Sequence, residues 1–149
     1  MRTKELERRE GQRTLLIVFD IDDEVSDGLL AVAREHAIAG AYFTAIGALS
    51  EVTLGYWEWK SKQYLRLPVR EQVEVLSLAG NIALGPDGAP KVHAHIVIVI
   101  SKRDGSAHGG HLLDARVRPT LEVMLVEVPK RLQRRLDAAT GLPLLDARA

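Results

Sequence analysis

Residues 92–100 read Val-His-Ala-His-Ile-Val-Ile-Val-Ile, and this stretch decides the fold. Its second half is apolar at every position, which is typical of a strand buried on both faces near the centre of a sheet. The residues Gly85-Pro-Asp-Gly88 before it and Asp104-Gly105 after it predict turns. We therefore expect residues 92–100 to form a central strand whose neighbours along the chain are reached through turns.

Segments of strand character lie on both sides of this central strand. They are residues 14–21, 42–46, 52–59, 64–69, 73–78 and 121–128. One helix is expected over residues 25–38, with Ser26 or Asp23 as its N-cap and Gly40 as its stop signal. Because most connections are short, the strands should form hairpins. The sequence thus predicts an α+β fold in which one main helix packs on an antiparallel or mixed β-sheet.

The chain has the size and composition of one globular domain. Its length is 149 residues, of which 46% are hydrophobic and 27% are charged. Residues 1–12 are mostly polar and charged, so we expect a flexible N-terminal arm there. A single domain should follow over residues 13–145, with a short tail over residues 146–149.

The charge balance and the absence of cysteine limit the function classes. Lys plus Arg and Asp plus Glu both number 20, so the basic excess typical of proteins that bind phosphate backbones is missing. A neutral chain also has little electrostatic protection against self-association, which favours an oligomer. Without cysteine, any metal ion must be held by His, Asp or Glu. The polar N-terminus and the lack of a long apolar run predict a cytoplasmic protein with no signal peptide and no membrane span.

His93 and His95 form a His-x-His motif at the start of the central strand. Side chains two residues apart on a strand share one face, and their Cα atoms lie about 6.6 Å apart at a rise of about 3.3 Å per residue. Two imidazoles in this position can bind one metal ion, each at about 2.0–2.1 Å. The alternative is an ordinary polar strand face without a metal.

His111 is the candidate for a third ligand. It follows Gly109 and Gly110 after the predicted turn, so it should return alongside the central strand. His108 could be the ligand instead, but it has the opposite strand parity, so only one of the two should face the site. Three histidines with one open position are the arrangement of a catalytic zinc site. Zinc is favoured, and Fe, Ni or Cu are alternatives.

These motifs resemble those of a known family, the plant and prokaryote conserved (PPC) domain. The similar stretches are residues 74–82 (EVLSLAGNI), His93-Ala94-His95, Gly109-Gly110-His111-Leu112, residues 45–55 (AIGALSEVTLG) and residues 140–143 (TGLP). They occur in the family's order and together span roughly residues 12–145. The resemblance implies a curved, mostly antiparallel sheet with a helix packed on it. It also implies a homotrimer in bacterial members, with the metal held by His93, His95 and His111 near the subunit interfaces.

The resemblance bears on DNA binding as well. Plant members carry AT-hooks and use the PPC domain for self-association and contacts with other proteins, and the DNA-binding label is often extended to bacterial members. An AT-hook needs an Arg-Gly-Arg-Pro core, which this sequence lacks. Its most basic run, residues 130–135 (KRLQRR), is expected to be a solvated face. We therefore expect a metal-binding regulatory or interaction module, with possible protein partners, rather than a DNA-binding protein.

An enzyme is the alternative, because the PPC fold also resembles that of acetolactate decarboxylase, which binds zinc through three histidines. This resemblance implies a zinc-dependent lyase or hydrolase acting on a small carbonyl or carboxylate substrate. Glu74 is then the candidate proton carrier, although a structural ion pair would also explain it. Arg70 or Arg118 is the candidate for binding a substrate carboxylate through a bidentate fork.

Overall fold

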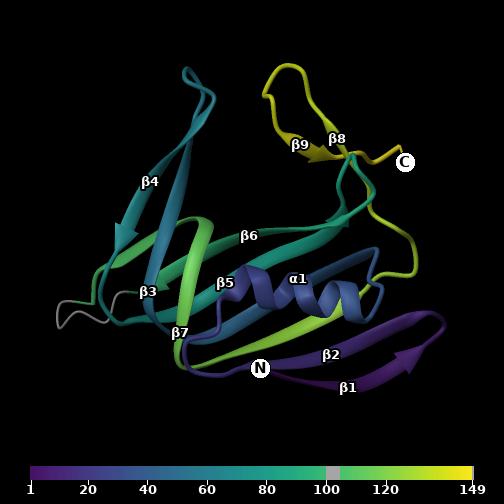
Figure 1. Ribbon diagram of the computed structural model, residues 1–149, viewed down its shortest axis with the longest axis horizontal. Helices are drawn as coiled ribbons and strands as arrows, with labels where there is room; N and C mark the ends of the chain where they lie inside the picture. Colours follow the sequence, from purple (N-terminus) through teal and green to yellow (C-terminus); the bar gives the residue numbers. More distant parts are fainter. Residues whose placement is uncertain (100–104, 149) are drawn as a thin grey trace.

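The computed structural model describes residues 1–99 and 105–148, except the side chains of residues 94–99. Its main sheet has the strand order β1-β2-β7-β6-β5-β3-β4, and each of these neighbouring pairs is antiparallel. The strands are β1 Arg2–Arg9, β2 Gln12–Phe19, β3 Gly40–Glu58, β4 Gln63–Val69, β5 Val73–Leu84, β6 Pro90–Val99 and β7 Ala107–Glu127. β6 lies between β7 and β5, which confirms the predicted central strand (Figure 1).

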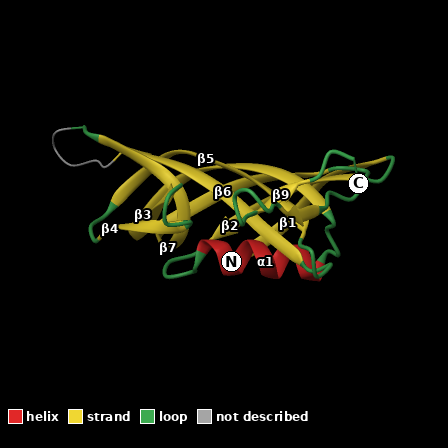
Figure 2. Ribbon diagram, turned by 90° about the horizontal axis from the view of Figure 1, so that it is seen from above, coloured by secondary structure: helices red, strands yellow, loops and turns green. Residues whose placement is uncertain are grey.

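The single main helix, α1 Val25–Glu35, packs on one face of this sheet (Figure 2). Its buried side chains, Val25, Leu29, Val32 and Ala33, recur at helical spacing and belong to the same core as Phe19 and other apolar residues of the sheet. The opposite sheet face carries no helix among the described residues. The predicted α+β fold, with one helix on a mostly antiparallel sheet, is confirmed.

The ends of the helix differ from the prediction. The N-cap is Glu24, whose carboxylate accepts a hydrogen bond from the Asp27 amide at 2.6 Å, and neither Ser26 nor Asp23 has this role. The Asp23 carboxylate instead accepts from the Asp20 amide at 2.8 Å. The helix ends before Ala37, which takes a left-handed φ of 53°. Gly40, the predicted stop, is already the first residue of β3.

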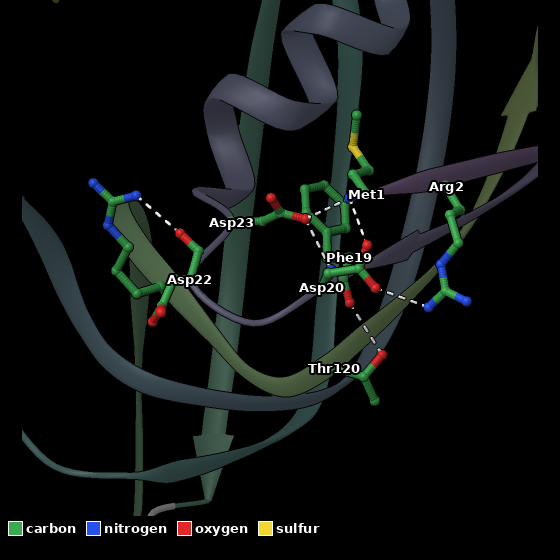
Figure 3. A network of polar contacts seen from close by, with 8 residues as sticks. Met1, Arg2, Phe19, Asp20, Asp22, Asp23 and Thr120 are labelled. Carbon is green, nitrogen blue, oxygen red and sulfur yellow. Dashed lines mark hydrogen bonds and ion pairs between the residues drawn. The ribbon is translucent and has the colours of Figure 1, made fainter.

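The residues expected to form a flexible arm contain an edge strand instead. β1 pairs with β2 along its length although all eight of its residues are exposed. Charged side chains are typical of sheet edges, where they discourage pairing with other chains. The Met1 ammonium donates to Asp20 at 2.7 Å, and the Arg2 guanidinium donates to the same carboxylate at 2.8 Å (Figure 3). A strand without buried positions has no hydrophobic periodicity, so the sequence pattern could not reveal it.

Two strands are much longer than predicted. The segments 42–46 and 52–59 are parts of one strand, β3, and residues 107–120 join the predicted segment 121–128 in β7. Register shifts interrupt the β3–β7 pairing at several points, which breaks the alternation of apolar residues. One shift falls at Gly47, which has a φ of 149° and where a Cβ atom would lie 2.4 Å from the Thr120 carbonyl oxygen. Glycine therefore allows the close strand contact at this bend.

The C-terminal segment forms a second, two-stranded sheet from β8 Arg134–Leu136 and β9 Pro143–Leu145. The Leu84 amide donates to the Leu132 carbonyl at 2.8 Å, and the Gln133 side chain donates to the Gly85 carbonyl at 2.7 Å. These bonds attach the hairpin to the turn between β5 and β6. The described part of the chain contains no helix with the length and apolar character of a transmembrane span.

Candidate metal centre

The hairpin of β6 and β7 carries the histidine motifs. Its register places residue 95 directly opposite His111, so the predicted return of the chain alongside the central strand is confirmed. His108 lies three residues earlier on β7, opposite residue 98, and is exposed. His111 is partly buried, as expected for the histidine with the parity of the site.

The His93 and His111 rings meet across this hairpin. Their centroids are 4.8 Å apart and their planes are inclined by 65°. His93 also lies opposite Asn81 of β5, so the pair on β6 and β7 has β5 as a further neighbour on the side of His93. The side chain of His95 lies outside the described residues. Among the described side chains no three metal-binding groups converge, so the ligand set of three histidines stays a prediction.

An aromatic wall from β3 and β4 borders the histidine pair. The Tyr64 ring stacks on His111 with centroids 4.8 Å apart, and the Trp57 ring meets Tyr64 edge-on at 4.9 Å. Burial raises the pKa of Tyr64, so its hydroxyl remains protonated at neutral pH. Gly55 lies opposite His111, and a Cβ atom there would come within 2.9 Å of the Tyr64 ring. A glycine at this position therefore leaves room for the stacked pair.

A cavity of about 270 Å³ opens beside these rings. The cavity lies between strands of the main sheet, the turn between β5 and β6, and the C-terminal hairpin. Its lining residues are Tyr64, Pro86, Lys91, Val92, His93, His111, Arg134, Leu142, Pro143 and Leu144. The wall is mostly apolar, with the histidine pair and Arg134 among its few polar groups. Such a mixture of apolar surface and convergent polar groups is typical of small-molecule sites.

Arg134 is a site residue that the sequence did not reveal. Only 5% of it is exposed, although it belongs to the basic run that was expected to be solvated. Its guanidinium donates to the Pro143 carbonyl at 3.2 Å and to the Asn81 side-chain oxygen. Burial lowers the pKa of Arg134. No local signal separates it from the exposed arginines beside it, because a contact between β5 and the C-terminal hairpin buries it.

Glu74, the candidate proton carrier, does not share this cavity. It is exposed and lies opposite residue 99, whereas residue 95 lies opposite Ala79, five positions further along β5. Five residues of strand correspond to about 16 Å at roughly 3.3 Å per residue. Glu74 instead borders an open hollow with Ile46 and Glu122. Within one chain, the structure therefore does not bring Glu74 to the histidines.

The two arginines expected to bind a carboxylate also lie elsewhere. Arg118 pairs with Asp22 at 3.5 Å near the start of the helix. Arg70 is exposed just after β4. Neither is among the described residues that line the histidine cavity. Of the predicted site residues, the structure thus brings His93 and His111 together and places the backbone of His95 opposite His111.

The donor set fits a divalent transition metal. Imidazole nitrogens suit zinc, copper, iron and nickel, and the histidine pair is close enough to share one ion. The partial burial of His93 and His111 and the aromatic wall limit the access of water to such an ion. The observed residues are therefore compatible with a metal, which would act as a Lewis acid when bound.

The fold and the site together define a class of single-domain proteins, in which a curved antiparallel sheet has one helix on one face and a histidine-bearing hairpin beside an open cavity. The chain belongs to the Plants and Prokaryotes Conserved (PCC) domain family, the PPC domain named above, whose model matches residues 6–129. The family assignment made from the sequence motifs is thus confirmed. The curated proteins include no match to the sequence.

Three solved structures illustrate this membership. A PPC protein from Pyrococcus horikoshii is 30% identical, with a TM-score of 0.82 over 90% of this chain and 91% of that one. A metal-containing protein from Archaeoglobus fulgidus is 30% identical, with a TM-score of 0.80 over 89% and 91%. A protein from Ralstonia eutropha JMP134, named a candidate DNA-binding protein, is 32% identical, with a TM-score of 0.81 over 89% and 90%.

A more distant likeness concerns the fold alone. Acetolactate decarboxylase from Bacillus subtilis strain 168 is 14% identical, with a TM-score of 0.52 over 88% of this chain and 59% of that one. The predicted similarity to the acetolactate decarboxylase fold is therefore confirmed. This chain spans only part of the decarboxylase.

Proposed function

We propose that this protein is a homotrimeric, metal-binding PPC module that serves a regulatory or interaction role in the cytoplasm. A divalent ion, zinc before iron or nickel, is bound by His93, His95 and His111. The observation that carries the proposal is the meeting of the His93 and His111 rings at 4.8 Å, on a hairpin whose register sets residue 95 opposite residue 111.

Two further observations support the metal. The relative from Archaeoglobus fulgidus, 30% identical over most of both chains, is named as metal-containing. The chain has no cysteine, so imidazoles are the ligands best suited to a borderline-soft ion. A histidine pair without a metal would be an ordinary polar contact, and elemental analysis distinguishes the two cases.

The sheet face opposite the helix supports self-association. Large apolar side chains are exposed there, including Tyr42 at 53%, Ile46 at 60% and Met124 at 41%. Tyr42 and Ile46 alternate along β3 with residues of the core. The strand is therefore apolar on both faces, one in the core under the helix and one exposed. Contiguous apolar surface of this kind typically mediates protein contacts. A second and third copy of the chain are the partners we propose for it.

DNA binding has weaker support in this chain. The basic run 130–135 would be the natural contact, but Arg134 is buried and Arg135 pairs with Asp146 at 2.7 Å. The zero net charge leaves little scope for counterion release. A DNA-binding function would require measurable binding at low salt that weakens steeply as salt rises.

A zinc-dependent lyase or hydrolase remains the second candidate, because a cavity of about 270 Å³ adjoins the histidine pair. A zinc ion there would polarise a carbonyl group or activate water. Glu74 could take part only if a neighbouring subunit supplied it, given its distance from the histidines along β5. Turnover of small oxo-acids that stops on chelation would favour this candidate over the regulatory module.

The direct test of the proposal is elemental analysis of the purified protein together with its mass in solution. We expect about one equivalent of a divalent transition metal per chain, lost on chelation, and a trimer by sedimentation equilibrium. A metal-free protein that also fails to bind added zinc would contradict the metal site. A monomer at micromolar concentration would contradict the trimer.

A further inference from the structure

We propose that the cavity beside the histidine pair binds a short-chain carboxylate, whose charged end is held by Arg134. This inference rests on the proposed function in one respect, since it takes His93 and His111 as the wall at the other end of the ligand. It assigns a role to a buried arginine that no sequence motif indicates.

Arg134 is buried, and its described partners carry no charge. A buried charge is costly unless it is paired, and the described acceptors of Arg134 are the neutral oxygens of Pro143 and Asn81. No described carboxylate forms an ion pair with it. Burial lowers its pKa, which expresses the same cost of holding the charge away from water. A bound anion would supply the missing counter-charge.

The neighbouring cations Lys91 and Arg135, in contrast, are paired with carboxylates. Lys91, which also borders the cavity, pairs with Asp87 at 3.2 Å. Arg135, the next residue along the chain, pairs with Asp146 at 2.7 Å. Among the described cations around the cavity, Arg134 is the one with only neutral partners. The cavity therefore has one preferred position for negative charge.

The guanidinium is also held in place for binding. Asn81, one of its acceptors, lies on β5 opposite His93, so Arg134 is linked to the strand that faces the histidine wall. Pro143, the other acceptor, belongs to β9. A planar fork fixed at two points loses little conformational entropy when it binds a carboxylate.

The walls select a small organic acid over inorganic phosphate. Val92, Leu142 and Leu144 give the cavity apolar sides that suit a short hydrocarbon chain. Its volume of about 270 Å³ is just below the roughly 300–1,000 Å³ typical of drug-sized sites, so the ligand should be short.

The C-terminal hairpin closes one side of this site. The Lys62 ammonium donates to the Ala139 carbonyl at 2.7 Å, which joins the turn between β3 and β4 to the loop between β8 and β9. In Figure 1 these two hairpins project to the same side of the main sheet. The cavity is thus bounded by the sheet, by Tyr64 of β4 and by Leu142 to Leu144.

Calorimetric titration with butyrate tests the proposal, with the neutral isostere butyramide and inorganic phosphate as comparison ligands. Wild-type protein should bind butyrate in preference to both. Arg134→Gln should weaken butyrate binding about tenfold or more, because a charge-assisted pair is lost. Arg134→Lys should recover part of the affinity. Arg131→Gln, an exposed change in the same segment, should leave the affinity within about twofold of wild type.

A second variant tests the cavity independently, in case the Arg134→Gln protein does not fold. Leu144→Trp should fill the cavity and abolish butyrate binding while Arg134 stays in place. Equal butyrate affinity in wild type and Arg134→Gln, unchanged binding by Leu144→Trp, or phosphate binding as tight as butyrate would each overturn the proposal. Metal content is measured on the same samples. Butyrate binding without any metal would contradict the proposed metal function alone, and metal without butyrate binding would contradict this inference alone.

Discussion

His93 of β6 and His111 of β7 hold their imidazole rings with centroids 4.8 Å apart, although eighteen positions of sequence number separate them. The antiparallel hairpin brings them together because residue 95 lies opposite residue 111 and His93 comes two positions before residue 95 on the same strand. The metal proposal depends on this geometry, since two imidazoles at this spacing can share one ion.

The Tyr64 ring should support the metal site by fixing the His111 ring, on which it stacks at 4.8 Å. Tyr64→Ala should weaken zinc affinity about tenfold, the lower end of the effect typical of groups that orient metal ligands. Tyr64→Phe keeps the stacked ring and should bind zinc within about twofold of wild type. Competition with a chromophoric chelator measures both affinities, and equal values for the two variants would show that the stacking has no role.

Gly47 should be one of the positions least tolerant of a side chain. Gly47→Ala should lower the free energy of unfolding by about 3 kcal/mol or more, because the new Cβ atom would lie 2.4 Å from the Thr120 carbonyl oxygen. Gly88→Ala is the matched control, since φ is +76° there but no atom lies within 4 Å. It should cost only about 1–2 kcal/mol. Urea unfolding measures both, and similar losses would mean that the close contact at Gly47 does not matter.

The oligomer should depend on the apolar sheet face. Ile46→Asp places a charge where 60% of a large apolar side chain is exposed in the isolated chain, so it should shift the protein toward the monomer. Leu136→Asp changes a residue that is 68% exposed on the C-terminal hairpin and serves as the control. Sedimentation velocity compares the two. If Ile46→Asp sediments like wild type, this face is not the subunit interface.

The C-terminal hairpin should loosen in acid through Asp137. Its carboxylate accepts hydrogen bonds from the Thr140 hydroxyl at 2.7 Å and the Thr140 amide at 2.8 Å, and these bonds lower the pKa of Asp137 from the ordinary 3.8. The stabilisation is therefore present above pH 3.8 and is lost as the pH falls through the lowered value.

Carbon-detected NMR titration of the Asp137 carboxyl checks this assignment. Thr140→Val removes the hydroxyl donor, so the pKa of Asp137 should rise toward 3.8. The stability difference between this variant and wild type should also narrow on acidification. An unchanged pKa in Thr140→Val would show that another group holds the carboxylate.

The sequence predicted the central strand, the helix and the hairpin between β6 and β7 because each has a clear pattern. Residues 92–100 are apolar on both faces in their second half, and α1 repeats its apolar residues at helical spacing. β1 was missed because its residues are all exposed, and β3 was divided because its bulges interrupt the alternation of apolar residues.

The site was predicted only in part, because only some of its residues are specified by local sequence features. His93 and His111 follow from strand parity and a turn, which are local features. Arg134 and Tyr64 reach the cavity through the C-terminal hairpin and β4, and no pattern in the sequence specifies those long-range contacts. Glu74 was predicted as the proton carrier because it lies in a stretch that resembles the family. In the structure it borders a different hollow from the histidine cavity, since residues of one family's motifs need not line the same cavity.

The most direct test of the central claim is zinc binding by two histidine variants and one control, measured by calorimetry on chelator-treated protein. His93→Ala and His111→Ala should each lose zinc binding by at least about tenfold, because each removes a metal ligand. His108→Ala changes an exposed histidine of the opposite parity on the same strand and should bind zinc like wild type. Full zinc binding by both His93→Ala and His111→Ala would contradict the proposed metal centre.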